Sequence, residues 1–405
     1  METEEGSRLR VALNASFWGQ ETAGSGQYVH HLVEALADLD GGPEVVLCGP
    51  GRLAAARPLP TGVRWHKVTA PRWLGQGSNL GKVWFEQITY PRATRAVGAA
   101  VAHVPYFASP LTPAVPTVVT VHDLIPLLLP AYRTRALVRG YAWLVARAAQ
   151  RASLVLTDAE ASRSDIVRHL GVQPERVRAV PLAASPSFRP VEDPQRLAAL
   201  RARYELPEEY LLYLGGFDQR RNLATLFQAL ALARQWQPAL PRLALAGASP
   251  AADTALTPDP RRLAAEAGLA QGVRFLGRVP EDDKPALYSG ALAFLFPSRY
   301  EGFGLTVLEA LACGTPCVVA NATSLPEVGG PGALLANPDD VAGWAEAILR
   351  LVSDGALRSG LRSAGLVHAA RFTWERTAQE TAAAYGDAAR YAAPPGPSPG
   401  GRRRS

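Results

Sequence analysis

The sequence has few cysteines and no long apolar run. Its three cysteines, Cys48, Cys313 and Cys317, are too few for a disulfide framework, and the last two lack the spacing of a zinc-binding pair. We therefore expect a reducing, cytoplasmic compartment and no bound metal. No segment reaches the roughly 18 to 20 apolar residues of a membrane-spanning helix, and the acidic start METEEGSRLR is unlike a secretory signal. The chain is predicted to be soluble, or at most bound at a membrane surface.

Lysine is also scarce. Only Lys67, Lys82 and Lys284 are lysines among the 42 basic residues, and the rest are arginines. Because arginine is abundant along the whole chain, an arginine at any one position is weak evidence for a site. The formal net charge of +6 suits phosphate-bearing ligands or an anionic surface. The motifs and the aromatic stacking platform of nucleic-acid-binding proteins are absent, so we expect no nucleic-acid partner.

Short apolar segments alternate with helical patterns along most of the chain. Strands that are apolar throughout are typical of a parallel sheet covered by helices on both faces. In the first half the predicted strands are residues 9–13, 44–48, 63–68, 101–104, 117–123, 154–158 and 177–182. In the second half they are residues 210–216, 242–247, 273–279, 292–298 and 316–320. The predicted fold class is α/β, with two doubly wound parallel-sheet, Rossmann-like domains facing a cleft.

The segment 185–194 concentrates Ser, Pro and charge, which is the composition of a linker. We therefore predict an N-terminal Rossmann-like domain at residues 1–188 and a C-terminal one at residues 189–371. Residues 372–393 have the pattern of a further helix. The tail 394–405 cannot bury enough apolar surface to fold and is predicted to be disordered.

One turn between a strand and a helix is richer than the others. In open parallel sheets, ligands bind beyond the carboxyl ends of strands, where helix N-termini point. The strand is predicted to end at Phe296, and Gly302 and Gly304 allow a ligand to approach the backbone closely. The helix is predicted to start near Leu305 or Thr306. The free N–H groups at this start carry about half a positive charge, which makes an anion site.

Two glutamates belong to this turn, Glu301 before the helix and Glu309 within it, with seven residues between them. A carboxylate beside an anion site repels the anion unless its oxygens accept hydrogen bonds from hydroxyls, and sugar and ribose hydroxyls are obvious donors. A structural alternative exists, because Thr306 and Glu309 have the T-x-x-E spacing of a capping box, which stabilises a helix by about 1 kcal/mol. Residue types alone do not decide between cap and ligand.

The segment SRYEGFGLTVLEALACGTPCVVANATSLPEV resembles the donor-site segment of the family 4 glycosyltransferases, retaining enzymes with the two-Rossmann GT-B architecture. The two glutamates with seven residues between them are the hallmark of that family. Five other segments are similar to family segments in the same order: HVPYFASP, TVVTVHDLIPLLLP, LTDAEASRSDI, YLLYLGGFDQRRNLATLFQAL and VRFLGRVPEDDKPALYSGALAFLFPS. The resemblance covers most of the chain.

The resemblance implies a retaining glycosyltransferase. Its donor would be a nucleotide diphosphate sugar carrying mannose or a similar hexose, and its acceptor a hydroxyl of a glycan or lipid-linked molecule in cell-surface polysaccharide or glycolipid synthesis. Glu309 falls on the position that binds the ribose hydroxyls, and Glu301 on the position that meets the transferred sugar. The backbone amides that would meet the sugar and the diphosphate belong to Phe303, Gly304, Leu305 and Thr306.

The resemblance also assigns basic and imidazole groups. Arg220 and Arg221 occupy the place of the family's phosphate clamp, although Arg221 stands where lysine is usual. From residue types alone they could be a solvated helix start, but cations there oppose the helix dipole, which favours a bound anion. His122 lies at the carboxyl end of a predicted strand, where a functional role outweighs a structural one. The resemblance assigns His122 to positioning the transferred sugar. We expect the neighbouring Asp123 to orient His122.

Further contacts to the donor are implied on both sides of the cleft. Gly24, Ser25 and Gly26 match the family's glycine-rich loop, which would cover the donor phosphates, and a tight turn is the alternative. Arg278 and Val279 match the backbone that recognises the base.

No cofactor and no metal is expected, because helix amides and arginines can stabilise the leaving diphosphate. The family's mechanism is a same-face displacement, which predicts retention without a covalent enzyme intermediate. The helix at 372–393 resembles the family's segment that crosses back onto the first domain.

The acceptor would bind the first domain, where the sequence is least informative. Segment 131–151 combines five arginines with Tyr141 and Trp143, which suits a helix resting on an anionic membrane. A helix that covers the sheet with a solvated basic face explains it as well. Two other function classes share the architecture, a nucleotide-sugar isomerase or epimerase and a non-catalytic nucleotide-sugar-binding protein. The first would not carry this donor segment, and the second would lose groups such as His122 or Glu301.

Overall fold

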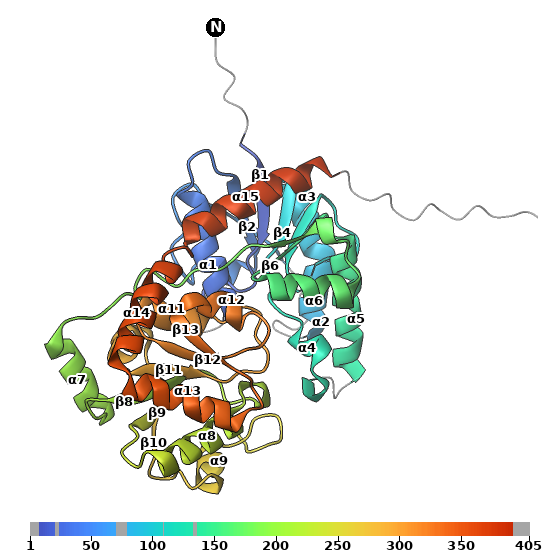
Figure 1. Ribbon diagram of the computed structural model, residues 1–405. Coiled ribbons are helices and arrows are strands. Elements are labelled where there is room, and N and C mark those ends of the chain that lie inside the picture. The colour runs from blue at the N-terminus through green and yellow to red at the C-terminus, as the bar shows by residue number, and fades with distance from the viewer. Residues whose placement is uncertain (1–7, 21–23, 70–78, 108, 133–135, 392–405) are drawn as a thin grey trace, which may run out of the picture.

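The computed structural model describes residues 8–20, 24–69, 79–107, 109–132 and 136–391. Figure 1 shows two α/β lobes, and the last helix of the chain returns from the second lobe to the first. The predicted disordered tail lies outside the described residues. Within the described ranges, no helix is both long enough and apolar enough to cross a membrane.

The first lobe is built on a seven-stranded parallel sheet with the strand order β3-β2-β1-β4-β5-β6-β7. Its strands are β1 (Arg10–Asn14), β2 (Glu44–Gly49), β3 (Arg64–Lys67), β4 (Val101–Val104), β5 (Thr117–Thr120), β6 (Leu154–Thr157) and β7 (Val177–Ala179). Its helices are α1 (Gly24–Ala37), α2 (Asn79–Trp84), α3 (Tyr90–Ala96), α4 (Ile125–Leu128), α5 (Ala136–Arg151) and α6 (Glu160–Leu170).

The second lobe is built on a six-stranded parallel sheet with the order β10-β9-β8-β11-β12-β13. Its strands are β8 (Tyr210–Leu214), β9 (Arg242–Ala246), β10 (Val273–Gly277), β11 (Ala293–Phe296), β12 (Cys317–Ala320) and β13 (Ala333–Ala336). The helices of this half of the chain are α7 (Pro194–Tyr204), α8 (Leu223–Trp236), α9 (Pro260–Glu266), α10 (Lys284–Ser289), α11 (Leu305–Ala312), α12 (Leu325–Gly329), α13 (Val341–Ser353), α14 (Gly355–Ala369) and α15 (Trp374–Arg390).

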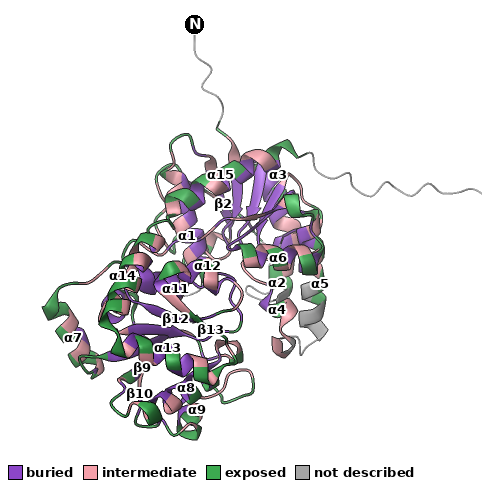
Figure 2. Ribbon diagram, viewed as in Figure 1, coloured by how far each residue is buried: buried purple, intermediate pink, exposed green. Residues whose placement is uncertain are grey.

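The central strands carry the core of each lobe. Every residue of β4, β5, β6, β8, β11 and β12 is buried, and Figure 2 shows these strands beneath helices whose outer faces are exposed. Burial on both faces explains why these segments are apolar throughout, and it confirms the predicted fold class. The sequence analysis does not predict β13. This edge strand is a four-residue apolar run, too short to be told from part of a helix.

The last helix, α15, packs against α1 of the first lobe. The hydroxyl of buried Tyr385 lies 2.6 Å from His103 Nδ1, and His103 Nε2 lies 2.8 Å from Thr120 Oγ1. Burial lowers the pKa of His103 to about 3, so the ring is neutral and offers one donor and one acceptor. Thr377 of the same helix donates a hydrogen bond to the carbonyl of Pro181 at 2.7 Å. Hydrogen bonds from Tyr385 and Thr377 therefore join α15 to the first lobe.

The carboxyl ends of the two sheets face each other at the junction of the lobes. Tyr132 of the first lobe donates a hydrogen bond to Asp218 Oδ1, beyond β8, at 2.6 Å. Ser162 of α6 donates one to the carbonyl of Gly302, beyond β11, at 2.8 Å. A site at this junction therefore takes residues from both lobes, as the open-sheet rule for ligand sites requires.

Candidate active site

The turn after β11 has the predicted form. The strand ends at Phe296 and α11 begins at Leu305, with Gly304 as the residue before the helix. Gly304 has φ +105°, a conformation that residues with a side chain rarely adopt. The first N–H groups of α11 have no hydrogen-bond partner within the helix, as at any helix start. The structure confirms the predicted helix start, but the capping-box alternative is wrong, because the cap is a glycine and Thr306 lies inside the helix.

Glu309 lies inside the protein rather than at its surface. It is 5% exposed, and its Oε2 accepts a hydrogen bond from the hydroxyl of Tyr288 at 3.0 Å. Burial raises the pKa of Glu309 to about 7, although Lys284 and the Tyr288 hydroxyl act in the opposite direction. A buried carboxyl group with this pKa gains from any further hydroxyl that donates to its charged form.

Glu309 borders a cavity of about 210 Å³ between the two lobes. Gly24 and Tyr28 of α1 line it from the first lobe, and Leu305 lines it from the start of α11. Trp374 of α15 closes another side. The cavity thus brings together three of the predicted ligand-binding residues, which lie far apart in the sequence.

The predicted glycine-rich loop is not a loop in the structure. Gly24, Ser25 and Gly26 form the first turn of α1, and Ala23 lies outside the described residues. Gly26 is needed there for a steric reason, because a Cβ atom would meet the carbonyl oxygen of Gln20 at 2.0 Å. Gly26 therefore marks a helix start pressed against the preceding chain, whereas a Cβ atom on Gly24 would meet nothing within 4 Å. The role of Gly24, Ser25 and Gly26 in covering the donor phosphates stays a prediction.

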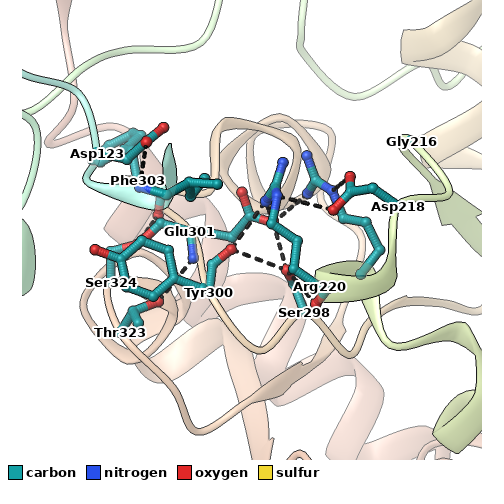
Figure 3. A network of polar contacts seen from close by, with 12 residues as sticks. Asp123, Gly216, Asp218, Arg220, Ser298, Tyr300, Glu301, Phe303, Thr323 and Ser324 are labelled. Carbon is teal, nitrogen blue, oxygen red and sulfur yellow. Dashed lines mark hydrogen bonds and ion pairs between the residues drawn. The ribbon is translucent and has the colours of Figure 1, made fainter. Parts of the chain in front are cut away.

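Arg220 lies in a cluster of opposite charges with Asp218 and Glu301 (Figure 3). Arg220 and Arg221 occupy a 3-10 turn, Gln219–Arg221, just before α8. Arg220 Nη1 lies 2.8 Å from Glu301 Oε1, and Arg220 Nε lies 3.1 Å from Asp218 Oδ1. Arg221 Nη1 pairs with the same oxygen of Glu301. Two guanidinium groups and two carboxylates therefore meet at one point beyond β8 and β11.

The neighbours of this cluster fix its geometry. The Ser298 hydroxyl donates to Glu301 Oε1 at 2.6 Å, and the Glu301 backbone N–H donates to Thr323 Oγ1 at 3.0 Å. The side chains of Arg220 and Arg221 are only 14% and 16% exposed, so the interpretation as a solvated helix start is wrong. Burial alone would lower the pKa of Arg220, but the Glu301 and Asp218 carboxylates outweigh it and raise the pKa above the ordinary value.

His122 lies beyond the end of β5 and is held by a carboxylate. Its Nδ1 is 2.8 Å from Asp158 Oδ2, and the Tyr28 ring meets the imidazole edge to face with centroids 4.8 Å apart. Burial by itself would lower the pKa of His122, but Asp158 outweighs it and the pKa is raised above 6.5. Asp158 therefore favours the protonated ring.

The prediction that Asp123 orients His122 is wrong. Asp123 Oδ1 instead accepts a hydrogen bond from the backbone N–H of Ile125 at 2.9 Å, at the start of α4. Asp158 takes the orienting role, and the sequence analysis missed it. The sequence did contain a signal for Asp158, because this residue directly follows β6. Strands β5 and β6 are adjacent, so their carboxyl ends meet at one edge of the sheet, where His122 also lies.

The loop before α11 lies directly against His122. A Cβ atom on Gly302 would meet the carbonyl oxygen of His122 at 2.2 Å, so only glycine fits between the lobes here. Electrostatic contacts cross the same junction, since Arg220 and Glu301 both act on the pKa of Asp123. The loop that carries Glu301 thus lies against the His122 backbone, but His122, Glu301, Arg220 and Arg221 are not among the residues that line the cavity.

The predicted base-recognition residues follow β10. Arg278 is exposed and Val279 is buried, and neither lines the cavity. Glu281, two residues further along, does line it. The role of Arg278 and Val279 stays a prediction.

One group of metal-ligand side chains gathers in the described part of the chain, which the sequence analysis missed. The ligand atoms of His30, His31 and Glu34 on α1 lie within 4.8 Å of one another. Glu34 already meets a cation, because Arg57 Nη2 lies 3.4 Å from its Oε1. His30 Nε2 lies 3.1 Å from its other oxygen. A metal ion would have to replace these contacts, and metal independence stays a prediction.

Helix α5 covers the first sheet with one face. Val145 and Ala148 are buried, as the covering-helix alternative predicts. On the other face Trp143 is 60% exposed, with the Arg147 guanidinium carbon 5.8 Å from a ring centroid. Arg135 lies outside the described residues. Contact of this face with an anionic membrane stays a prediction.

The pair of His122 and Asp158 predicts a pH-dependent stability. Because the pKa of His122 is raised above 6.5, the pair stabilises the fold fully below that pH and loses its effect as the pH rises through the raised pKa. We expect Asp158→Asn to lower the free energy of unfolding by about 1 to 3 kcal/mol near pH ~6, and by less near pH ~9.

Urea unfolding at the two pH values measures this difference. Asp339→Asn is the control, because Asp339 pairs with Arg299 at the exposed surface, where such pairs contribute about 0 to 1 kcal/mol. An equal cost of Asp158→Asn at both pH values would contradict the assignment.

Comparisons with known proteins match both halves of the chain. The family described as Glycosyltransferase Family 4 matches residues 22–188, and Glycosyl transferases group 1 matches residues 208–354. The O-antigen chain mannosyltransferase B of Escherichia coli is 36% identical over 270 residues, which cover 66% of this chain and 69% of that protein. The serotype-specific mannosyltransferase WbdA of Escherichia coli is 30% identical over 266 residues, 65% of this chain but 32% of that protein.

Solved structures share the architecture. Sucrose-phosphate synthase from Thermosynechococcus elongatus superposes with a TM-score of 0.72 at 24% identity, over 94% of this chain and 98% of that one. Anabaena Alr3699/HepE in complex with UDP and glucose gives 0.70 at 17% identity, over 94% and 100%. At these identities the likeness shows the fold alone, which is GT-B. With a mannosyltransferase relative and family matches in both lobes, the chain belongs to the family 4 glycosyltransferases.

Proposed function

We propose that this glycosyltransferase moves mannose or a similar hexose from a nucleotide diphosphate sugar to a hydroxyl of a glycan or lipid-linked acceptor. The transfer retains the anomeric configuration and serves cell-surface polysaccharide or glycolipid synthesis. The Escherichia coli relatives, an O-antigen mannosyltransferase and a serotype-specific mannosyltransferase, support the sugar and the pathway class. The neighbouring structure that contains UDP and glucose supports a nucleotide sugar as the donor class.

One observation carries the proposal: the cavity between the lobes has a buried carboxyl group and helix N-termini on its walls. Glu309 is the carboxyl group, and Gly24 and Leu305 are the first residues of α1 and α11. Helix N-termini favour anions, and a buried carboxylate favours hydroxyl donors. A nucleoside diphosphate combines both groups, with phosphates for the helix starts and ribose hydroxyls for Glu309.

The leaving diphosphate needs positive partners. Arg220 and Arg221 are held in place by Glu301 and Asp218 before any ligand arrives, so little reorganisation is required. Diphosphate oxygens would compete with these carboxylates for the same guanidinium groups. We propose that this exchange loosens Glu301 from the arginines and lets it accept hydroxyls of the transferred sugar. Helix amides and arginines supply the charge, so the transfer is proposed to need no metal.

The geometry around Glu301 disfavours a covalent mechanism. The Ser298 hydroxyl donates to its Oε1 at 2.6 Å, and this contact, which stays when the arginines turn to the diphosphate, weakens the carboxylate as a nucleophile. His122, oriented by Asp158, is proposed to position the sugar through a ring nitrogen. The leaving phosphate would then take the proton of the acceptor hydroxyl on the same face.

The stereochemical outcome tests this mechanism. We expect the product to keep the anomeric configuration of the donor, which NMR coupling constants of the product sugar measure. Mass spectrometry of the enzyme during turnover should show no hexosyl adduct. An adduct on Glu301, or an inverted product, would contradict the proposed displacement.

The donor class is tested by thermal shift against nucleoside diphosphates and their sugars. Saturating one of them should raise the unfolding temperature by a few degrees, because a ligand at about 100 times its Kd adds about 2.7 kcal/mol. Glu309→Ala should weaken this binding about tenfold or more, since hydrogen bonds to a charged group contribute about 1.5 to 3 kcal/mol. Glu346→Ala, at an exposed glutamate of α13, is the control and should keep the shift. If no nucleoside diphosphate shifts the wild-type protein, the donor class is wrong.

The junction at Gly302 predicts a further effect on transfer. Gly302→Ala places a Cβ atom against the His122 carbonyl, so the loop and the first lobe must separate. We expect kcat to fall at least about tenfold, because small misplacements in an active site are costly. Gly360→Ala is the matched control. Gly360 is an exposed residue of α14, and a Cβ atom there would meet nothing within 4 Å. Equal kcat values for the two variants would show that the contact has no role in transfer.

A further inference from the structure

Helix α6 starts at the junction of the lobes without a cap of its own. The residue before it is Ala159, which has an extended backbone and no side-chain group that could accept a hydrogen bond. The first N–H groups of a helix have no intrahelical partner, and Ser, Thr, Asp or Asn usually provides one at this position. The first turn of α6 therefore needs an acceptor from elsewhere.

Glu327 of the second lobe provides that acceptor. Its Oε2 accepts a hydrogen bond from the Glu160 N–H at 2.9 Å, and its Oε1 accepts one from the Ala161 N–H at 2.8 Å. Glu327 lies on α12, on the side of the second lobe that faces the first (Figure 1). A carboxylate at a helix N-terminus is favoured by the helix dipole as well as by the hydrogen bonds. One lobe thus caps a helix of the other.

Two more hydrogen bonds run from the same helix to the loop before α11. The Ser162 hydroxyl donates to the Gly302 carbonyl at 2.8 Å, and the Tyr300 hydroxyl donates to Asp165 Oδ2 at 2.6 Å. The first half of α6 is therefore tied to the second lobe at three places. Of the three, the contact of Glu327 is the one in which a charged group meets two backbone donors.

The position of α6 matters for the reaction because of what precedes it. Asp158 lies two residues before the first residue of α6, and it holds His122 at 2.8 Å. The Gly302 loop, tied to Ser162, lies against the His122 carbonyl on the other side. A shift of α6 away from α12 therefore moves Asp158 and His122 away from the Glu301 side of the site.

We propose that Glu327 is a positioning residue that holds the lobes closed by capping α6 across the junction, and thereby sets His122 against the Glu301 loop. Glu327 is not among the residues that line the cavity, so it acts through α6 and not through the donor. Opening of the lobes exposes two backbone donors of α6 to water, and closure gives them a carboxylate. The measurement of kcat that tests this role rests on the proposed function, whereas the measurement of the radius of gyration does not.

The variant Glu327→Ala removes both acceptors. We expect kcat to fall about tenfold, because closure of the lobes completes such sites. The radius of gyration from small-angle X-ray scattering should rise above that of the wild-type protein. Glu327→Gln keeps one carbonyl acceptor. Its kcat and its radius of gyration should therefore lie between those of Glu327→Ala and the wild-type protein. It carries the test if Glu327→Ala does not fold. Glu346→Ala is the matched control and should keep both values.

A second substitution separates closure from helix stability. In the Glu327→Ala background, Ala159→Ser gives α6 a cap within its own lobe. We expect it to recover the unfolding temperature but not kcat or the scattering curve. Recovery of kcat to the wild-type value would show that Glu327 only stabilises the helix and would overturn the proposal. Wild-type kcat and scattering in Glu327→Ala would overturn it as well. If the wild-type protein transfers no sugar from any donor, the proposed function fails, and scattering alone decides the role of Glu327.

Discussion

The arrangement of the site depends on one close contact, the approach of the Gly302 backbone to the carbonyl of His122. A side chain on residue 302 does not fit here, since its Cβ atom would come within 2.2 Å of the His122 carbonyl oxygen. The contact brings the carboxyl edge of the first sheet against that of the second. The His122 imidazole, the two guanidinium groups and the start of α11 all lie beyond strand ends that face this junction.

Charge is balanced within the protein around this contact. Arg220 and Arg221 share an oxygen of Glu301, and Asp218 meets the Nε side of Arg220. A largely buried cluster of ion pairs adds little to the free energy of unfolding, because the cost of removing the charges from water offsets their attraction. Its effect is on orientation, because the guanidinium groups of Arg220 and Arg221 are largely desolvated and each is held by a carboxylate. Arginine in place of lysine at position 221 suits this arrangement, because its planar fork binds a carboxylate in a fixed orientation.

The return of the chain to the first lobe connects distant segments to the same site. Tyr385 of α15 contacts His103, and His103 contacts Thr120 at the end of β5. Thr120 lies 3.1 Å from the Tyr28 hydroxyl, and the Tyr28 ring packs on His122. The three hydrogen bonds among these residues are buried, so their polar groups have no water to replace a lost partner. The last helix therefore supports the first-lobe half of the site as well as joining the lobes.

Local patterns in the sequence determined the helix start beyond Phe296 and every strand of the described residues except β13, because hydrophobic periodicity and glycine act over a few residues. They also placed His122 and Glu301 beyond strand ends, where the sites of open sheets lie, and Glu309 in the helix that follows Glu301. Tertiary structure alone decided the partners of these groups. Asp158, not Asp123, lies beside His122, and Arg221 and Arg220 pair with Glu301, which is 80 and 81 residues away. Glu327 caps a helix 167 residues before it. Such pairs depend on the packing of whole lobes, and no short stretch of sequence contains both members.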